Sequence, residues 1–282
     1  MAVTGSSGAG TTTVTKTFQD VFRREQIRAA MVEGDGFHRY DRAEMRVRIA
    51  EAQAQGRTLS HFGPEANLFE DIEALFEGYG GTGRGRARHY LHDEEEAQRA
   101  GRPAGTFTPW EDLPPSDLLF YEGLHGGVVA GGVDVARHAD LLVGVVPIIN
   151  LEWIQKISRD RAQRSVPIEE VVDTILRRMP DYVRYICPQF SRTHVNFQRV
   201  PTVDTSNPFI ARFIPTPDES FLVIRFRDPT GIDFPYLLSM LHDSFMSRPN
   251  CIVVPGGKME LAMQLILTPM ILQLMDRKRR VS

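Results

Sequence analysis

The run Gly5-Ser6-Ser7-Gly8-Ala9-Gly10-Thr11-Thr12 decides the fold, because it matches the phosphate-binding pattern GxxxxG followed by a hydroxyl residue. Its glycines let successive backbone N–H groups converge on phosphate oxygens at distances that a side chain would block. Thr11 stands where the pattern has lysine, and Thr12 would offer a hydroxyl to Mg²⁺. A plain glycine turn is the alternative, but a strand before the run and an amphipathic helix after it favour phosphate binding.

Outward from this run, the chain alternates between strands and helices. Residues 2–4 form the end of a first strand, and Val14, Phe18, Val21 and Phe22 share one face of a helix that ends near Arg24. Further strands are predicted at residues 29–32, 118–121, 140–149, 221–226 and 251–254. Further helices are predicted at residues 43–55, 66–77, 151–164 and 168–184. In the last of these we expect five inward side chains: Val171, Val172, Ile175, Leu176 and Met179.

This order predicts an α/β protein with a P-loop kinase fold: a mixed sheet with a parallel core flanked by helices and antiparallel strands at one edge. Residues 78–105 show little apolar periodicity and are predicted to form an irregular loop or flap. No linker divides the chain, so residues 1–282 are predicted to be one domain rather than two small ones.

Composition narrows the class of function. A formal net charge of −3 argues against binding of nucleic acid by bulk neutralisation. Cys187 and Cys251 have no disulfide or zinc spacing, and the chain begins without a basic, apolar leader, so a cytoplasmic location is expected. The most apolar stretch, residues 261–274, is too short for a membrane span and contains Pro269, so no membrane partner is expected.

Two acids each follow a short apolar strand and lie next to a glycine: Asp35 and Glu122. Because ligands bind at the carboxyl ends of parallel strands, both carboxylates should face the same crevice as the glycine-rich run. We interpret Asp35 as a general base and Glu122 as a metal-linked acid. Turn capping is the alternative for either residue alone.

One predicted helix carries a charged face, formed by Lys156, Arg159, Asp160 and Arg164. Three cations around one carboxylate suit a clamp for a transferring γ-phosphoryl group, and they would replace the lysine that the glycine-rich run lacks. A solvated salt-bridged face is the alternative.

Donor side chains also follow Asp35. His38, Arg42 and Arg46 recur every fourth residue, and such a face would either hold an anionic acceptor or be solvated. The predicted flap carries five more polar side chains that a closing segment would use: Arg84, Arg86, Arg88, Tyr90 and His92.

Together these segments resemble bacterial-type phosphoribulokinase. The motifs are GSSGAGTT at 5–12, EGDGFHRYDRAEM at 33–45, SHFGPEAN at 60–67, GRARHYLHD at 85–93, FYEGLHG at 120–126, VPIINLEWIQKISRDR at 146–161 and VDTSNPFIAR at 203–212. They run nearly from end to end, and threonine in place of the lysine is shared by the bacterial type. The resemblance implies a fold like that of nucleoside monophosphate kinases.

The implied reaction is transfer of phosphate from ATP, with Mg²⁺, to ribulose 5-phosphate, giving ribulose 1,5-bisphosphate for the Calvin cycle. The resemblance implies that Asp35 deprotonates the sugar and that Asp160 lies near the metal and phosphates. Lys156 and Arg159 resemble γ-phosphate contacts. The metal residues implied are Thr12, Glu122 and Asp160, and the sugar-phosphate contacts implied are His38, Arg42, Tyr90, His92 and Arg164.

Regulation is implied by the same resemblance. Bacterial members form homo-oligomers activated by NADH and inhibited by AMP, and Arg24, Arg225 and Arg248 are similar to allosteric positions. Ser6 and Ser7 occupy the turn in which chloroplast-type enzymes have a redox cysteine, so thioredoxin control is not expected. Two alternatives are a kinase of another small metabolite, such as uridine or pantothenate, and a non-catalytic nucleotide-binding regulator.

Overall fold

The structure, a computed structural model, describes residues 1–5, 11–146, 148–164, 167–211 and 213–281, without the side chains of residues 11–13, 160–164 and 281. The main strands are β1 (Ala2–Gly5), β2 (Ala29–Glu33), β5 (Leu118–Gly123), β8 (Leu142–Val146), β9 (Val195–Pro201), β10 (Ser220–Phe226), β11 (Phe245–Arg248) and β12 (Cys251–Pro255). The helices are α1 (Thr11–Arg24), α2 (Arg42–Ala54), α3 (Phe69–Thr82), α4 (Glu94–Ala100), α5 (Ile149–Arg164), α6 (Ile168–Asp181), α7 (Phe234–Met240) and α8 (Met259–Val281).

The described strands above form one mixed sheet in the order β11-β12-β10-β9-β8-β1-β5-β2. Neighbours from β2 to β9 are parallel, and those from β9 to β11 are antiparallel. The short strand β1 is central, because Ala2 pairs with Tyr121 on one side and with Leu142 on the other. The predicted fold class is confirmed, antiparallel edge included.

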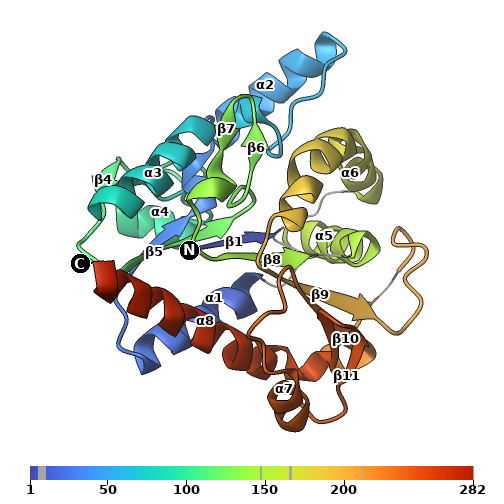
Figure 1. Cartoon of the computed structure of the whole chain (residues 1–282). Helices are drawn as coiled ribbons and strands as arrows, with labels where there is room; N and C mark the ends of the chain where they lie inside the picture. Colours follow the sequence, from blue (N-terminus) through green and yellow to red (C-terminus); the bar gives the residue numbers. More distant parts are fainter. Residues whose placement is uncertain (6–10, 147, 165–166, 212, 282) are drawn as a thin grey trace.

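Helices cover both faces of this sheet (Figure 1). On one face, α1 and α8 pack on the sheet in a core that includes Phe18, Phe120 and Ile266. On the other face, α3 packs in a second core, where the rings of Phe76 and Tyr121 are 5.3 Å apart. Because neighbouring residues of β5 are buried on opposite faces, its residues 118–121 are all apolar or aromatic, as expected for a covered parallel strand.

The helix predicted at residues 66–77 begins three residues later, at Phe69, and forms α3. Pro64–Ala66 form a separate 3₁₀ turn, and Asn67 is extended, with φ −132° and ψ 155°, because it bridges to His38. The helix continues to Gly83, whose φ of +67° ends it in the left-handed region that glycine adopts readily.

The irregular flap predicted at residues 78–105 is wrong in part. This segment contains the last turn of α3, the strand β3 (Arg86–Ala87) and the helix α4. Strand β3 pairs with β4 (Glu111–Asp112), and Asp93 caps α4 by accepting a hydrogen bond from the backbone N–H of Glu96. Short elements of this kind have too few residues to show a period. A second small hairpin pairs β6 (Val129–Ala130) with β7 (Val133–Asp134).

The helix predicted at residues 168–184 ends earlier, at Asp181, and a π-helical turn, Tyr182–Ile186, follows it. Its inward face was predicted too wide: Val171 and Ile175 are buried against Ile157 of α5, whereas Leu176 is 52% exposed. The apolar stretch at residues 261–274 lies within α8 and is buried at Met263 and Leu267. None of the described helices combines the length and the apolarity that crossing a membrane requires.

Candidate active site

The carboxyl ends of the parallel strands bring the predicted acids together. Strands β2 and β5 are in register, with Glu33 opposite Glu122. Directly after β2, the 3₁₀ turn Gly34–Phe37 presents Asp35 at this edge. This turn needs glycine at position 36, because a Cβ there would lie 2.0 Å from the backbone oxygen of Arg88.

The predicted phosphate loop begins at the same edge. Gly5 ends β1, and a Cβ there would lie 2.7 Å from the backbone oxygen of Val145 in the neighbouring strand. Thr11 begins α1, so the positive end of that helix follows the loop. Ser6, Ser7, Gly8, Ala9 and Gly10 lie outside the described residues, as do the side chains of Thr11 and Thr12.

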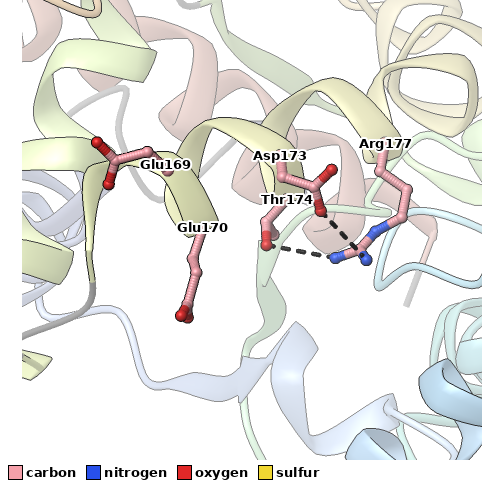
Figure 2. Close-up of a pocket in the computed structure, with 5 residues that line it drawn as sticks. All are labelled: Glu169, Glu170, Asp173, Thr174 and Arg177. Carbon is pink, nitrogen blue, oxygen red and sulfur yellow. Dashed lines mark hydrogen bonds and ion pairs between the residues drawn. The ribbon is translucent and has the colours of Figure 1, made fainter.

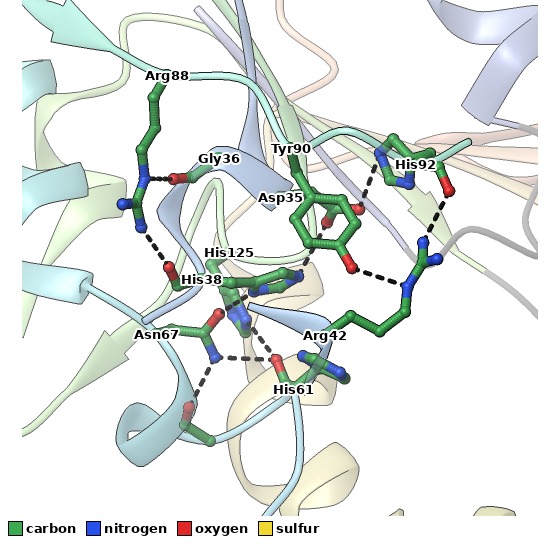
Figure 3. Close-up of polar contacts among 11 residues, drawn as sticks. Asp35, Gly36, His38, Arg42, His61, Asn67, Arg88, Tyr90, His92 and His125 are labelled. Carbon is green, nitrogen blue, oxygen red and sulfur yellow. Dashed lines mark hydrogen bonds and ion pairs between the residues drawn. The ribbon is translucent and has the colours of Figure 1, made fainter. Parts of the chain in front are cut away.

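Asp35 is held between two histidines (Figure 3). One oxygen, Oδ1, lies 3.2 Å from Nε2 of His38, and the other, Oδ2, lies 3.6 Å from Nε2 of His92. Burial raises the pKa of the Asp35 carboxyl, but the hydrogen bond and charge of His38, and after them the charge of His92, outweigh it and lower the pKa to about 2. The Asp35 side chain is 39% exposed, so the ionised group is still accessible to a substrate.

Glu122 has the opposite electrostatic environment. Burial, and after it the negative charges of Asp35 and Glu33, raise the pKa of the Glu122 carboxyl to about 7. Two nearby carboxyls with pKa values pushed apart are typical of a site that handles protons or cations. Because a bound divalent cation would offset the repulsion around Glu122, this carboxyl fits the metal-linked role predicted for it.

A complete metal site is not formed by the described side chains, among which no group of three His, Cys, Asp or Glu could hold a metal ion. Of the three metal residues that the resemblance implies, Thr12 and Asp160 have side chains outside the description. Glu122 is therefore the one of the three whose surroundings support metal binding here.

The side chains of Arg42, Tyr90 and His92 also meet beside Asp35 (Figure 3). Arg42 donates to the Tyr90 hydroxyl at 3.3 Å and to the backbone oxygen of His92 at 2.7 Å. The predicted repeat of three donors on one helix face is wrong, because His38 precedes α2 and lies in the turn region after β2. Arg46, one helical turn beyond Arg42, is exposed.

The charged helix face predicted at residues 156–164 belongs to α5, which follows the carboxyl end of β8 and so lies at the same edge of the sheet. Lys156 and Arg159 are partly buried and three residues apart, which places them on one side of α5. The side chains of Asp160 and Arg164 lie outside the description.

Comparison with known proteins decides the family. The sequence profile of the Phosphoribulokinase / Uridine kinase family matches residues 1–206, well over half of the chain. The chain belongs to the phosphoribulokinase/uridine kinase family. The chromosomal phosphoribulokinase of Cupriavidus necator is 66% identical over 284 residues, covering 100% of this chain and 97% of the relative. The phosphoribulokinase of Nitrobacter vulgaris is 64% identical over 282 residues, covering 99% of this chain and 97% of the relative.

A solved structure agrees with these relatives. The phosphoribulokinase from Rhodobacter spheroides is 57% identical, with a TM-score of 0.92, over 99% of this chain and 97% of that chain. The resemblance predicted from the motifs is therefore confirmed, and this member of the phosphoribulokinase/uridine kinase family has the fold of the solved phosphoribulokinase. The family also implies that the chain uses ATP.

The site of this phosphoribulokinase/uridine kinase family member contains polar residues for which the sequence predicts a different role or none. Arg88 was expected to act in a flap, but its guanidinium donates to the backbone oxygens of Gly36 and His38 at 2.7 and 2.6 Å. It also lies over the rings of Phe107 and Trp110, 3.8 and 4.8 Å from their centroids. Arg88 therefore fixes the backbone on both sides of Phe37.

Three further polar residues lie near Asp35 and His38: Asn67 and His125, which are buried, and His61, which is partly exposed (Figure 3). Nε2 of His125 lies 3.1 Å from the backbone oxygen of His61, and the ring of His61 is 4.7 Å from that of His38. Burial above all lowers the pKa of both the His61 and the His125 imidazole to about 3, so both are neutral. No local sequence pattern brings these three residues together, although a buried polar side chain such as that of Asn67 must find hydrogen-bond partners.

Two of the grooves on the described surface are lined by charged residues. One, of about 280 Å³, is lined by residues of α1, β2 and β5, including Glu33 and Glu122, and by His89, which follows β3. The other, of about 430 Å³, lies on α6, where Arg177 donates to Thr174 at 3.3 Å and pairs with Asp173 (Figure 2). The α6 groove contains none of the predicted site residues, so we place the chemistry at the Asp35 edge instead.

Proposed function

We infer that the chain is a phosphoribulokinase: it transfers the γ-phosphate of ATP to the C1 hydroxyl of ribulose 5-phosphate, giving ADP and ribulose 1,5-bisphosphate, the CO₂ acceptor of the Calvin cycle. The observation that carries this inference is near full-length identity of 59–66% to bacterial phosphoribulokinases. The same relatives favour a sugar-phosphate acceptor over uridine and favour an active kinase over a non-catalytic regulator.

In the proposed reaction, Asp35 accepts the proton of the C1 hydroxyl while that oxygen forms its bond to the γ-phosphorus. The bond from the γ-phosphorus to the β,γ-bridging oxygen breaks, and its electron pair leaves with ADP. Because the pKa of Asp35 is only about 2, the carboxylate is ionised at neutral pH but is a weak base. Proton transfer is therefore expected to accompany formation of the new P–O bond rather than to precede it.

The phosphate side of the site is proposed to consist of the backbone of residues 5–12 and the cations of α5. Lys156 and Arg159 lie on one side of α5 at the sheet edge that also carries Asp35, and we assign them to the charge of the transferring phosphoryl group. Thr12, Glu122 and Asp160 would hold Mg²⁺. When bound, Mg²⁺ supplies charge neutralisation for the triphosphate.

The acceptor side is proposed to include Arg42, Tyr90, His92 and Arg164. The contacts of Arg42 with Tyr90 and with the His92 backbone support this assignment, because they hold three donors together beside Asp35. His38 was predicted to bind the sugar phosphate, yet both of its ring nitrogens already face protein groups. We therefore propose that its first role is to orient Asp35.

Several wider properties are proposals that rest on the family resemblance. We propose that residues 1–282 act as one cytoplasmic domain, supported by the single main sheet that runs from β2 to β11. We also propose that the chain forms a homo-oligomer that NADH activates and AMP inhibits. The candidate effector residues are Arg24, Arg225 and Arg248. The guanidinium of Arg24 donates to Thr268 of α8 at 2.8 Å. Arg225 of β10 and Arg248 of β11 both lie opposite Cys251 of β12 in the register of the sheet.

A coupled assay of ADP release, run with ribulose 5-phosphate, ribose 5-phosphate, xylulose 5-phosphate and uridine, tests this function. We expect turnover with ribulose 5-phosphate to exceed that with any other acceptor by at least about tenfold, the ratio given by 1.4 kcal/mol of discrimination. Preference for uridine, or ADP release that no acceptor increases, would overturn the assignment. Parallel assays with NADH or AMP test the effectors separately.

A further inference from the structure

A buried amide, that of Asn67, lies beside His38 on the side away from Asp35 (Figure 3). The residue is only 1% exposed. Its Nδ2 donates to the backbone oxygens of His61 and Gly63 at 2.9 and 2.7 Å, and its Oδ1 lies 2.8 Å from Nδ1 of His38. All three contacts are therefore within hydrogen-bond distance.

The hydrogens of this amide can be counted. The amide nitrogen carries two hydrogens, and the two backbone carbonyls take both of them. In the opposite orientation, the amide oxygen would face two carbonyl oxygens that cannot donate. The oxygen Oδ1 therefore faces His38, and because an amide oxygen only accepts, Nδ1 of His38 must carry a hydrogen.

This count fixes what the other ring nitrogen can do. A neutral His38 with its hydrogen on Nδ1 would direct the lone pair of Nε2 at the Asp35 oxygen, which lies 3.2 Å away. An ionised carboxylate has no hydrogen to share, so this arrangement is repulsive. Contact with ionised Asp35 is favourable once Nε2 is also protonated and donates to Oδ1.

We propose that Asn67 is a positioning residue that keeps a hydrogen on Nδ1 of His38 and so makes His38 the cationic partner of ionised Asp35. The cation at His38 occupies Oδ1 of Asp35. It leaves Oδ2 of Asp35, which faces His92, to accept the proton of the acceptor hydroxyl. This use of Oδ2 rests on the proposed role of Asp35 as base, whereas the protonation of His38 does not.

The backbone holds Asn67 in place for this role. His38 and Asn67 form an antiparallel bridge, flanked by hydrogen bonds from Arg39 N–H to the Ala66 oxygen at 2.8 Å and from Leu68 N–H to the Phe37 oxygen at 2.9 Å. Because Arg88 also binds the backbone oxygen of His38, the ring has little freedom to leave the amide.

The charges around His38 agree with a cation. Burial lowers the pKa of the His38 imidazole, but the hydrogen bond and charge of Asp35, and after them the hydrogen bond to Asn67, raise it overall, against the positive charge of Arg88. The other titratable groups near the pair are His61, Tyr90, His92, Tyr121, Glu122 and His125. His61 and His125 are neutral, so among these groups neither adds a positive charge against a cation at His38.

Nitrogen-15 NMR of the imidazole rings tests the proposal without substrate or turnover. The His38 signals are assigned by their loss in His38→Gln. In the wild type we expect Nδ1 protonated at every pH and Nε2 deprotonating above the usual pKa of histidine. We then compare Asn67→Leu, which removes the acceptor, with Asn67→Asp, which keeps an acceptor oxygen and adds negative charge. The matched control is Ser60→Ala. Ser60 lies in the same loop as His61 and Gly63, and its hydroxyl donates a hydrogen bond to Asp181 at 2.7 Å that the variant loses.

The two Asn67 variants should move the His38 titration in opposite directions, by roughly one pH unit each, which corresponds to one hydrogen bond to a charged group. Ser60→Ala should leave it unchanged. General damage to the loop cannot produce shifts of opposite sign. A neutral wild-type His38 at pH 7 with its hydrogen on Nε2, or an identical titration in wild type and Asn67→Leu, would overturn the proposal. The wild-type spectrum decides this even if a variant does not fold.

A kinetic readout follows from the same charge state. Loss of the His38 proton leaves Asp35 without its partner and removes a positive charge near two anionic substrates, so kcat/KM should fall above the pKa of His38. In Asn67→Leu this alkaline limb should move to lower pH by about one unit. A uniform loss at all pH values would show a merely structural role and contradict the proposal. Absence of activity with ribulose 5-phosphate in the wild type would instead refute the proposed function and leave the NMR result standing.

Discussion

Replacement of Arg88 by methionine tests whether this side chain holds the catalytic turn. The variant loses two hydrogen bonds from a charged donor, to Gly36 at 2.7 Å and to His38 at 2.6 Å, and the stacking on Phe107 and Trp110. Such hydrogen bonds are each worth about 1.5–3 kcal/mol, and cation–π contacts about 0.5–2 kcal/mol. Because Arg88 is partly exposed, and water can replace some of these contacts, we take the low end.

The expected loss in the free energy of unfolding is thus about 4 kcal/mol, measured by urea denaturation. Turnover should also fall by about 10²-fold, because a displacement of roughly 1 Å in a catalytic group has an effect of that size. Arg88→Lys, which keeps the charge but cannot bridge two carbonyls with a planar fork, should be intermediate.

The matched control for this experiment is Arg84→Met, an exposed arginine of the same segment. Its effect on stability should stay within about 0.5 kcal/mol. The reasoning is refuted if Arg88→Met and Arg84→Met have the same stability and turnover.

Two further predictions concern burial and charge. Because the pKa of Glu122 in the folded protein is raised to about 7, its ionisation opposes folding, and the stability it contributes is lost as pH rises from about 4.5 through 7. Glu122→Gln should therefore raise the free energy of unfolding at pH 8 by about 3 kcal/mol, with little change at pH 4, while turnover falls. In α6, Ile175→Ala should cost about 2–4 kcal/mol and Leu176→Ala under about 1 kcal/mol in urea denaturation, because only the former is buried.

The parallel half of the fold could be predicted because its strands are short apolar runs between helices. Residues 118–121 show this best: with Phe120 buried on one face and Tyr121 on the other, no residue of the strand needs to be polar. Strand β9 was not predicted, because Asn196, Gln198 and Arg199 interrupt its apolar residues, and Asn196 is buried only through its hydrogen bonds to Thr193 and Phe190.

In the candidate site, Asp35 and Glu122 were found because each follows a strand whose end is fixed by the sheet. His38 was misplaced because spacing alone put it on a helix, whereas the structure ends the 3₁₀ turn there and starts α2 only at Arg42. The contribution of Asn67 depends on its bridge to His38, which lies 29 residues away, and no local pattern reports a contact of that kind. Arg88 was placed in a flap by the sequence, and its contact with the backbone of His38, 50 residues away, could not be predicted for the same reason.

The most direct test of Asp35 as the base is the rate of single-turnover phosphoryl transfer to ribulose 5-phosphate by Asp35→Asn. The affinity of the variant for ATP is measured separately. Asp41→Asn is the matched control, because asparagine caps a helix as well as aspartate does and Asp41 caps α2. We predict that Asp35→Asn loses about 10²–10⁴-fold in rate with ATP affinity unchanged, whereas Asp41→Asn keeps the wild-type rate. A rate for Asp35→Asn equal to that of Asp41→Asn would contradict the assignment of Asp35 as the base.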